Sequence, residues 1–207
     1  MREYVALYGG SFDPPHNGHV LTISHLLNDE RIAEVWLIPS GDARYDKAPV
    51  ASGAERVAML NVVHEELFNK SSRIRIVELQ QDGDLGESTA ISLVKALREE
   101  GEKRPFFYVI GADNLATLPQ WREFDVLIQE VTFLLVPRLG EAIPDVLPPY
   151  VVHLSKGSVA ACSFSSTELR ELLMGECEVA GYLPLEVLRV IEERGLYGRS
   201  VAAKTSS

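Results

Sequence analysis

A short segment close to the N-terminus concentrates residues that could bind a phosphate group. Residues 9–19 read GGSFDPPHNGH, and paired glycines let a backbone approach a ligand closely. His16 and His19 are spaced so that, at the start of a helix, both rings could face one ligand. Imidazolium donors could hold non-bridging phosphate oxygens and stabilise charge that develops during group transfer. A helix starting here would add unpaired N–H groups and the positive end of its dipole, with Asn17 as the predicted N-cap.

This segment has two other interpretations. It could be a structural loop with two incidental histidines, or the histidines could bind a metal. The metal interpretation is disfavoured because no third ligand stands at a suitable spacing. The segment follows a strand-like run and opens a helical one, as a phosphate-binding turn requires. The sequence therefore favours phosphate binding.

A second segment of this kind lies in the C-terminal third of the chain. Residues 163–170 read SFSSTELR, in which Ser165 and Glu168 have the spacing of a capping box. An ordinary helix start would explain that spacing. The alternative is a second phosphate-binding helix start, with hydroxyls from Ser165 and Thr167. Arg170 would then make charge-assisted hydrogen bonds to the β- and γ-phosphates of ATP.

Alternating strand-like and helix-like runs predict the scaffold that must position these segments. Apolar runs predict strands over residues 4–8, 35–39, 74–79, 106–111, 132–137 and 151–154. Helical periodicity covers residues 18–27, 54–68, 89–100, 167–174 and 185–194. This alternation is typical of an α/β protein with a doubly wound parallel sheet. Ligands bind such sheets beyond the carboxyl ends of the strands, so the loops after Tyr8, Pro39, Ile110 and Pro137 are expected to form the site.

Length and charge limit the remaining function classes. The 207 residues suit a single domain over residues 1–198, with a flexible tail over 199–207. The net charge of -10 disfavours nucleic acid and anionic membranes as partners. No apolar run approaches the roughly 20 residues of a membrane span. Two cysteines outside any CxxC pair and the lack of a secretory signal predict a cytoplasmic protein. A homo-oligomer is left open.

The two motifs, in this order, resemble those of the HxGH nucleotidyltransferase superfamily. The GGxFDPPHxGH form resembles the bacterial nicotinate mononucleotide adenylyltransferases, and the second motif is similar to their ISSTxIR, with Phe164 and Leu169 in place of isoleucines. The resemblance spans about residues 5–197. It implies a Rossmann-like nucleotidyltransferase fold. It also implies transfer of AMP from ATP to nicotinate mononucleotide, which gives nicotinate adenine dinucleotide and pyrophosphate in NAD biosynthesis.

The resemblance also implies roles for individual residues. The catalytic residues would be His16, His19 and Arg170. ATP would be bound by Gly9, Gly10, Ser11, Phe12, His16, His19, Gly111, Asp113, Arg138, Ser165, Ser166, Thr167 and Arg170. The acceptor would be bound by Ser11, Lys47, Arg56, Thr89 and Trp121. Mg²⁺ would be held mainly by the ATP phosphates, so no metal site made by the protein is expected.

Several of these residues have simpler explanations. Asp113, implied to bind ribose hydroxyls, could be a helix N-cap, and Trp121, implied to stack on the pyridine ring, could be a core or surface anchor. Arg138, implied to lie near adenine, could be a solvated surface residue. Thr89 could be a plain helix cap.

One loop departs from the family pattern. Residues 40–47 read SGDARYDK where the family carries a PPHK-like loop, and only Lys47 can be aligned. The resemblance places this loop near the acceptor, so the acceptor could instead be nicotinamide mononucleotide or another phosphorylated molecule such as phosphopantetheine. From a different class, the chain could be an ATP-sensing module without turnover.

Overall fold

The fold is built on one parallel sheet. The computed structural model describes residues 2–41, 50–78, 89–137, 144, 146–154, 164–175 and 177–199. Within these ranges the strands are β1 (Tyr4–Gly10), β2 (Ile32–Pro39), β3 (Ile74–Ile76), β4 (Phe106–Gly111), β5 (Val131–Val136) and β6 (Val151–His153). They pair in the order β3-β2-β1-β4-β5-β6, and every pairing is parallel. The predicted doubly wound α/β sheet is confirmed.

Six α-helices in the described residues connect and flank the strands. They are α1 (Asn17–Asn28), α2 (Gly53–Val62), α3 (Ala90–Glu99), α4 (Phe124–Glu130), α5 (Ser166–Met174) and α6 (Leu185–Arg194). A π-helical turn, η1 (Val63–Leu67), continues α2. Short 3₁₀ turns are η2 (Ala112–Asn114), η3 (Leu118–Gln120) and η4 (Leu196–Gly198). None of the helices in the described ranges is long and apolar enough to cross a membrane.

The two faces of the sheet carry separate hydrophobic clusters. Val5 and Leu7 of β1 belong to the cluster shared with α3 and α4, whereas Ala6 between them belongs to the cluster shared with α1. This alternation follows from the two-residue period of a strand. All three side chains are 0% exposed, because helices cover both faces of a parallel sheet. The strands therefore form a rigid platform for the loops at their ends.

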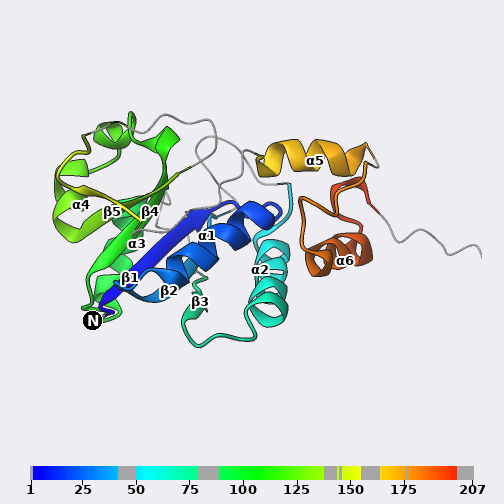
Figure 1. Ribbon diagram of the computed structural model, residues 1–207, viewed down its shortest axis with the longest axis horizontal. Coiled ribbons are helices and arrows are strands. Elements are labelled where there is room, and N and C mark those ends of the chain that lie inside the picture. Colours follow the sequence, from blue (N-terminus) through cyan, green and yellow to red (C-terminus); the bar gives the residue numbers. More distant parts are fainter. Residues whose placement is uncertain are drawn as a thin grey trace, which may run out of the picture.

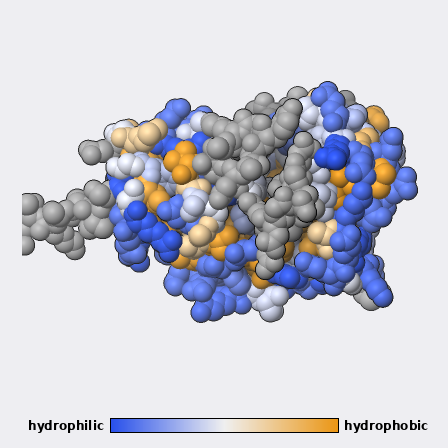
Figure 2. Space-filling model, turned by 180° about the vertical axis from the view of Figure 1, so that it is seen from behind, coloured by the Kyte–Doolittle hydropathy of each residue, from blue (hydrophilic) through white to orange (hydrophobic). Residues whose placement is uncertain are grey.

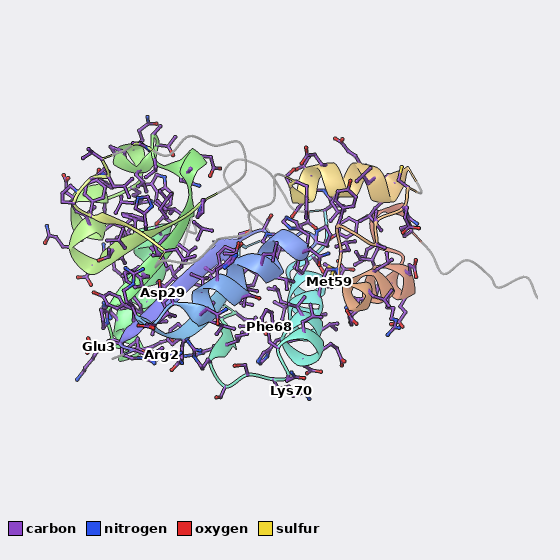
Figure 3. All side chains as sticks on the ribbon, viewed as in Figure 1. Arg2, Glu3, Asp29, Met59, Phe68 and Lys70 are labelled. Atoms are coloured by element: carbon purple, nitrogen blue, oxygen red, sulfur yellow. The ribbon has the colours of Figure 1, made fainter. Side chains whose placement is uncertain are left out.

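A third cluster holds the C-terminal helices in place. Met59 of α2 packs in it with Leu169 of α5, Val187 and Ile191 of α6, and Tyr197 of η4. Figure 1 shows α5 and α6 to one side of the sheet, next to α2, and Figure 3 places Met59 on the side of α2 that faces them. The third cluster thus fixes the position of the N-terminal end of α5 relative to α2.

On the face shown in Figure 2, apolar residues lie in small separate groups among hydrophilic ones. This mixed surface matches the ordinary content of charged residues in the sequence, 24%.

Three expectations about the elements need correction. The helix predicted over 54–68 is α-helical only to Val62 and then widens into η1. The sequence did not predict α4, which has seven residues and follows Glu123 in a left-handed conformation (φ 51°); a helix this short shows little periodicity. The N-cap of α1 is His16, not Asn17, which is the first helical residue. The predicted limits of the single domain stay a prediction, and residues 200–207 of the predicted tail lie outside the described residues.

Candidate functional site

The site lies where the direction of strand order changes. Strands β1 and β4 are neighbours at the centre of the sheet. After β1 the chain continues to β2 on one side, and after β4 it continues to β5 on the other side, which opens a crevice at the carboxyl ends of β1 and β4. Gly9 and Gly10 end β1, and Gly111 ends β4. The predicted loops after these two strands therefore meet at one edge of the sheet.

Phe12 shapes the turn that leaves β1. A Cβ built on Gly10 would lie 3.2 Å from its ring, so a larger residue would crowd the ring. Phe12 has a φ of 48° and is 0% exposed. Any contact between Phe12 and ATP would therefore come from its backbone, because its side chain belongs to the core.

The two histidines are joined through the start of α1. The backbone N–H of His16 donates to Nδ1 of His19 at 3.0 Å, and the two rings stack with centroids 3.7 Å apart. Asn17 instead ties the helix start to the C-terminal region, since its backbone N–H donates to Tyr182 O and its side chain to Gly181 O. The N-cap is therefore His16 and not the predicted Asn17, and its backbone N–H is accepted by Nδ1 of His19, three residues later.

This hydrogen bond fixes the tautomer of His19. Because Nδ1 accepts a backbone N–H, the proton of the neutral ring resides on Nε2. Nε2 is the ring nitrogen more distant from the backbone, so His19 presents an N–H donor rather than an acceptor. A donor is what an oxygen of a phosphate group requires.

The start of α5 docks against the loop that carries the histidines. Ser166 Oγ donates to Pro14 O at 3.0 Å, and Arg170 Nη1 donates to Asp13 O at 2.6 Å. The ring of Phe164 lies 5.1 Å from that of His16. Figure 1 shows the first turn of α5 beside the N-terminal end of α1. These contacts bring the two motifs together at one place.

Ser165 caps α5 as its spacing predicts. Its side chain accepts the Glu168 N–H, and the Glu168 carboxylate accepts the Ser165 N–H at 2.7 Å. Thr167 Oγ1 accepts from Arg170 Nη2 at 3.2 Å. The hydroxyls proposed to bind phosphate thus lie at the first turn of α5, where the helix dipole favours negative charge, and the Arg170 guanidinium reaches back to that turn from the next one.

Buried charge is concentrated at this place. Among the described residues, the polar or charged side chains in the buried class are Asp13, His16, Asp29 and Arg56. Asp13 and His16 belong to the histidine loop, and Arg56 of α2 donates to Ser11 O next to it. The exception is Asp29, which is paired with Arg31 at 2.7 Å and lies near the N-terminal end of the chain, away from α5 (Figure 3).

Arg56 holds loops together. Its side chain is 0% exposed, and it donates to Ser11 O at 2.9 Å, to Ser40 O at 2.6 Å and to Ala51 O at 3.2 Å. These bonds join the ends of β1 and β2 to the start of α2. The role implied for Arg56 in acceptor binding stays a prediction; in the structure its guanidinium contacts backbone carbonyls.

The end of β4 carries a second group of predicted residues. Asp113 is exposed in η2, whose N-cap is Gly111, so the capping alternative for Asp113 is wrong. Trp121 is half-buried and meets Tyr108 and Phe133 edge-on, with centroids 5.8 and 5.9 Å away. Burial raises the pKa of Tyr108 to about 12, so its hydroxyl is neutral at physiological pH. Trp121 is thus a partial core anchor.

The remaining predicted residues divide into two groups. Thr89 is the N-cap of α3 and accepts from the Ser92 N–H at 3.3 Å, so its alternative role as a helix cap is confirmed. Lys47 and Arg138 lie outside the described residues.

Sequence reasoning missed Asp13. Its carboxylate accepts hydrogen bonds from the Val50 and Ala51 backbones and from the Tyr197 hydroxyl. Within the run FDPP an aspartate is typical of a turn, so its partners could not be identified from the sequence.

The side chains of this site suit a phosphorylated ligand that brings its own metal ion. In the described ranges, no group of three or more His, Cys, Asp or Glu residues could hold a metal ion, and both oxygens of Asp13 already accept hydrogen bonds. Mg²⁺ arriving with a nucleotide fits this arrangement, since it is commonly held by phosphate oxygens and water.

Comparison with known proteins supplies the family. Residues 7–172 match the cytidylyltransferase-like family. A relative from Halalkalibacterium halodurans, named "Probable nicotinate-nucleotide adenylyltransferase", is 33% identical over 98% of this chain and 95% of its own. The nicotinate-nucleotide adenylyltransferase of Bacillus subtilis is 29% identical over 93% of this chain and 97% of its own. The fold resembles that of Plasmodium falciparum nicotinic acid mononucleotide adenylyltransferase complexed with NaAD, with a TM-score of 0.74 and 22% identity, over 97% of this chain and 100% of that one.

Proposed function

Since the chain belongs to the cytidylyltransferase-like family, among its nicotinate-nucleotide adenylyltransferases, we propose that it transfers AMP from ATP to nicotinate mononucleotide. The products are nicotinate adenine dinucleotide and pyrophosphate, and the reaction belongs to NAD biosynthesis. ATP and pyridine mononucleotides are compounds of the cytoplasm, so a cytoplasmic location is part of the proposal.

The reaction is a direct in-line displacement. An oxygen of the acceptor 5′-phosphate forms a bond to the α-phosphorus of ATP, while the bond from that phosphorus to the bridging oxygen of pyrophosphate breaks. The electron pair of the broken bond leaves with pyrophosphate. Because the attacking phosphate is already anionic, the step needs no strong general base and no covalent enzyme intermediate. Catalysis consists of positioning and charge stabilisation.

The named residues divide this work between the two helix starts. His16 and His19 act at the α-phosphate, where the Nε2–H of His19 donates to a non-bridging oxygen. Arg170, with the hydroxyls of Ser165 and Thr167, holds the departing pyrophosphate. Mg²⁺, when bound with ATP, neutralises part of the phosphate charge.

Residues at the ends of β1 and β4 complete the substrate sites. Gly9 and Gly10 admit ATP close to the backbone, and Asp113 binds the ribose hydroxyls. The resemblance assigns Arg138, which lies outside the described residues, to the adenine. On the acceptor side, Trp121 stacks on the pyridine ring.

The observation that carries this proposal is the docking of α5 on the histidine loop. Arg170 Nη1 lies 2.6 Å from Asp13 O, and Ser166 Oγ lies 3.0 Å from Pro14 O. One triphosphate can therefore reach the imidazoles and the guanidinium together.

An acceptor panel tests the proposal. ATP is incubated with nicotinate mononucleotide, nicotinamide mononucleotide or phosphopantetheine, and products are identified by mass together with pyrophosphate release. We expect nicotinate adenine dinucleotide as the main product. Preferential adenylation of another acceptor would overturn the substrate assignment, and ATP binding without pyrophosphate release from any mixture would support a sensing module instead.

A further inference from the structure

The carboxylate of Asp13 joins four segments that are distant in the sequence. It is 1% exposed. Oδ2 accepts the Val50 N–H at 2.8 Å, and Oδ1 accepts the Ala51 N–H at 3.0 Å. Oδ1 also accepts the Tyr197 hydroxyl at 2.6 Å. The start of α2 and the C-terminal turn are thereby tied to the histidine loop.

Asp13 also sets the position of the guanidinium of Arg170. Nη1 of Arg170 donates to the backbone carbonyl of Asp13 at 2.6 Å and lies 3.4 Å from its Oδ2. The Arg170 side chain is only 11% exposed, so this attraction is weakly screened by water. Because Nη1 is held by Asp13, the guanidinium of Arg170 has a fixed position, and its Nη2 faces Thr167 at the start of α5.

Tyr197 adopts a conformation that needs a compensating interaction. Its φ is 53°, in the left-handed region, between Gly195 (φ 64°) and Gly198 (φ 78°). A bulky residue is uncommon there, and the hydroxyl of this side chain donates to the Asp13 carboxylate. Burial, with a further contribution from Asp13, raises the pKa of the Tyr197 hydroxyl, so it remains a donor at physiological pH.

We propose that Asp13 and Tyr197 are positioning residues that hold Arg170 in the geometry for binding and transferring the triphosphate. Tyr197 fixes the orientation of the Asp13 carboxylate, and Asp13 fixes the guanidinium. The inference rests on the proposed function insofar as Arg170 binds the phosphates of ATP.

A double-mutant cycle between Tyr197 and Arg170 tests this coupling. Tyr197→Phe removes one hydroxyl and keeps the ring, and we expect kcat/KM for ATP to fall about tenfold, within the loss caused by slight misplacement of a catalytic group. The KM for the acceptor should not change. In an Arg170→Ala background the same substitution should have no further effect, because its effect passes through Arg170. Asp13→Asn should lower kcat/KM for ATP further than Tyr197→Phe.

The matched control is Arg199→Ala. Arg199 lies in the same C-terminal turn and donates to Leu173 O and Cys177 O, without contacting Asp13. It should lower the melting temperature and leave kcat/KM for ATP unchanged. The inference would be overturned by normal kinetics of Tyr197→Phe, by an equal loss in the Arg170→Ala background, or by the same kinetic loss in Arg199→Ala.

Direct ATP titration without acceptor separates this inference from the proposed function. If the wild-type protein binds ATP but does not adenylate nicotinate mononucleotide, the acceptor assignment fails. The double-mutant cycle between Tyr197 and Arg170 can then be measured on ATP dissociation constants. Losses of ATP affinity that are non-additive support the coupling, and additive losses overturn it.

Discussion

Replacing His19 with asparagine would separate two tasks that its imidazole performs. Nδ1 accepts the His16 N–H at 3.0 Å and caps α1, while Nε2 is the donor proposed for the α-phosphate. The Oδ1 of asparagine stands where Nδ1 of histidine does and can accept the same N–H, but no asparagine atom reaches the place of Nε2. His19→Asn therefore keeps the cap and removes the catalytic donor, whereas His19→Ala removes both.

The structure sets the expected magnitudes for the two variants. Loss of one transition-state donor costs about 10²–10³ in kcat, or about 2.7–4 kcal/mol. Loss of a helix cap costs about 1 kcal/mol of stability. We therefore expect both variants to lower kcat by about 10²-fold or more. Both variants lose the ring stacking with His16, so the comparison between them isolates the cap: His19→Ala should unfold with a free energy about 1 kcal/mol lower than that of His19→Asn.

The assay combines initial rates with denaturation. Pyrophosphate release at saturating ATP and nicotinate mononucleotide gives kcat, and urea unfolding gives stability. Asn17→Ala is the control, because it removes the side-chain bond to Gly181 O at the same helix start without touching the rings; its kcat should stay within about twofold, as expected for a group outside the reacting centre. A folded His19→Asn protein with near wild-type kcat would refute the reasoning.

Three further predictions test other contacts. Arg170→Ala should raise the KM for ATP and lower kcat, each by about tenfold or more, since it removes charge-assisted bonds to phosphate; initial rates with unchanged ATP dependence would confine Arg170 to helix packing. Phe164→Leu should lower kcat by up to about tenfold, because its edge contact with the His16 ring corresponds to about 0.5–1.5 kcal/mol of aromatic pairing; an unchanged kcat would make the contact dispensable. Arg104 lowers the pKa of Glu102 to about 2, so the stabilisation by this pair is present above the unfolded pKa of about 4.3 and is lost as the pH falls toward 2. Glu102→Gln should lose up to about 1 kcal/mol near neutral pH, as for a partly exposed pair, and should show a smaller drop in stability on acidification; denaturation curves with equal acid sensitivity would contradict this.

The sequence alone determined the features that depend on local spacing. The alternation of strands and helices predicted the parallel sheet, because the hydrophobic period that marks a strand or a helix is set by residues close together in the chain. The capping box of Ser165 forms within four residues of chain, as its spacing predicts, and so does the helix cap that was the alternative role of Thr89. The loops after β1 and β4 meet because the carboxyl ends of adjacent parallel strands share an edge.

Only the tertiary structure decided how the site is held together. Arg170 and Asp13 are 157 positions apart, and Tyr197 and Asp13 are 184 apart. Their meeting depends on the packing of α5, α6 and η4 against α2 in the third cluster. No pattern within one segment specifies which distant segment will cover it, since that choice comes from the shape and burial of whole packed faces. For the same reason, the bonds from Arg56 to three backbone carbonyls could be seen only in the fold; the role in acceptor binding that the resemblance implies for Arg56 stays a prediction.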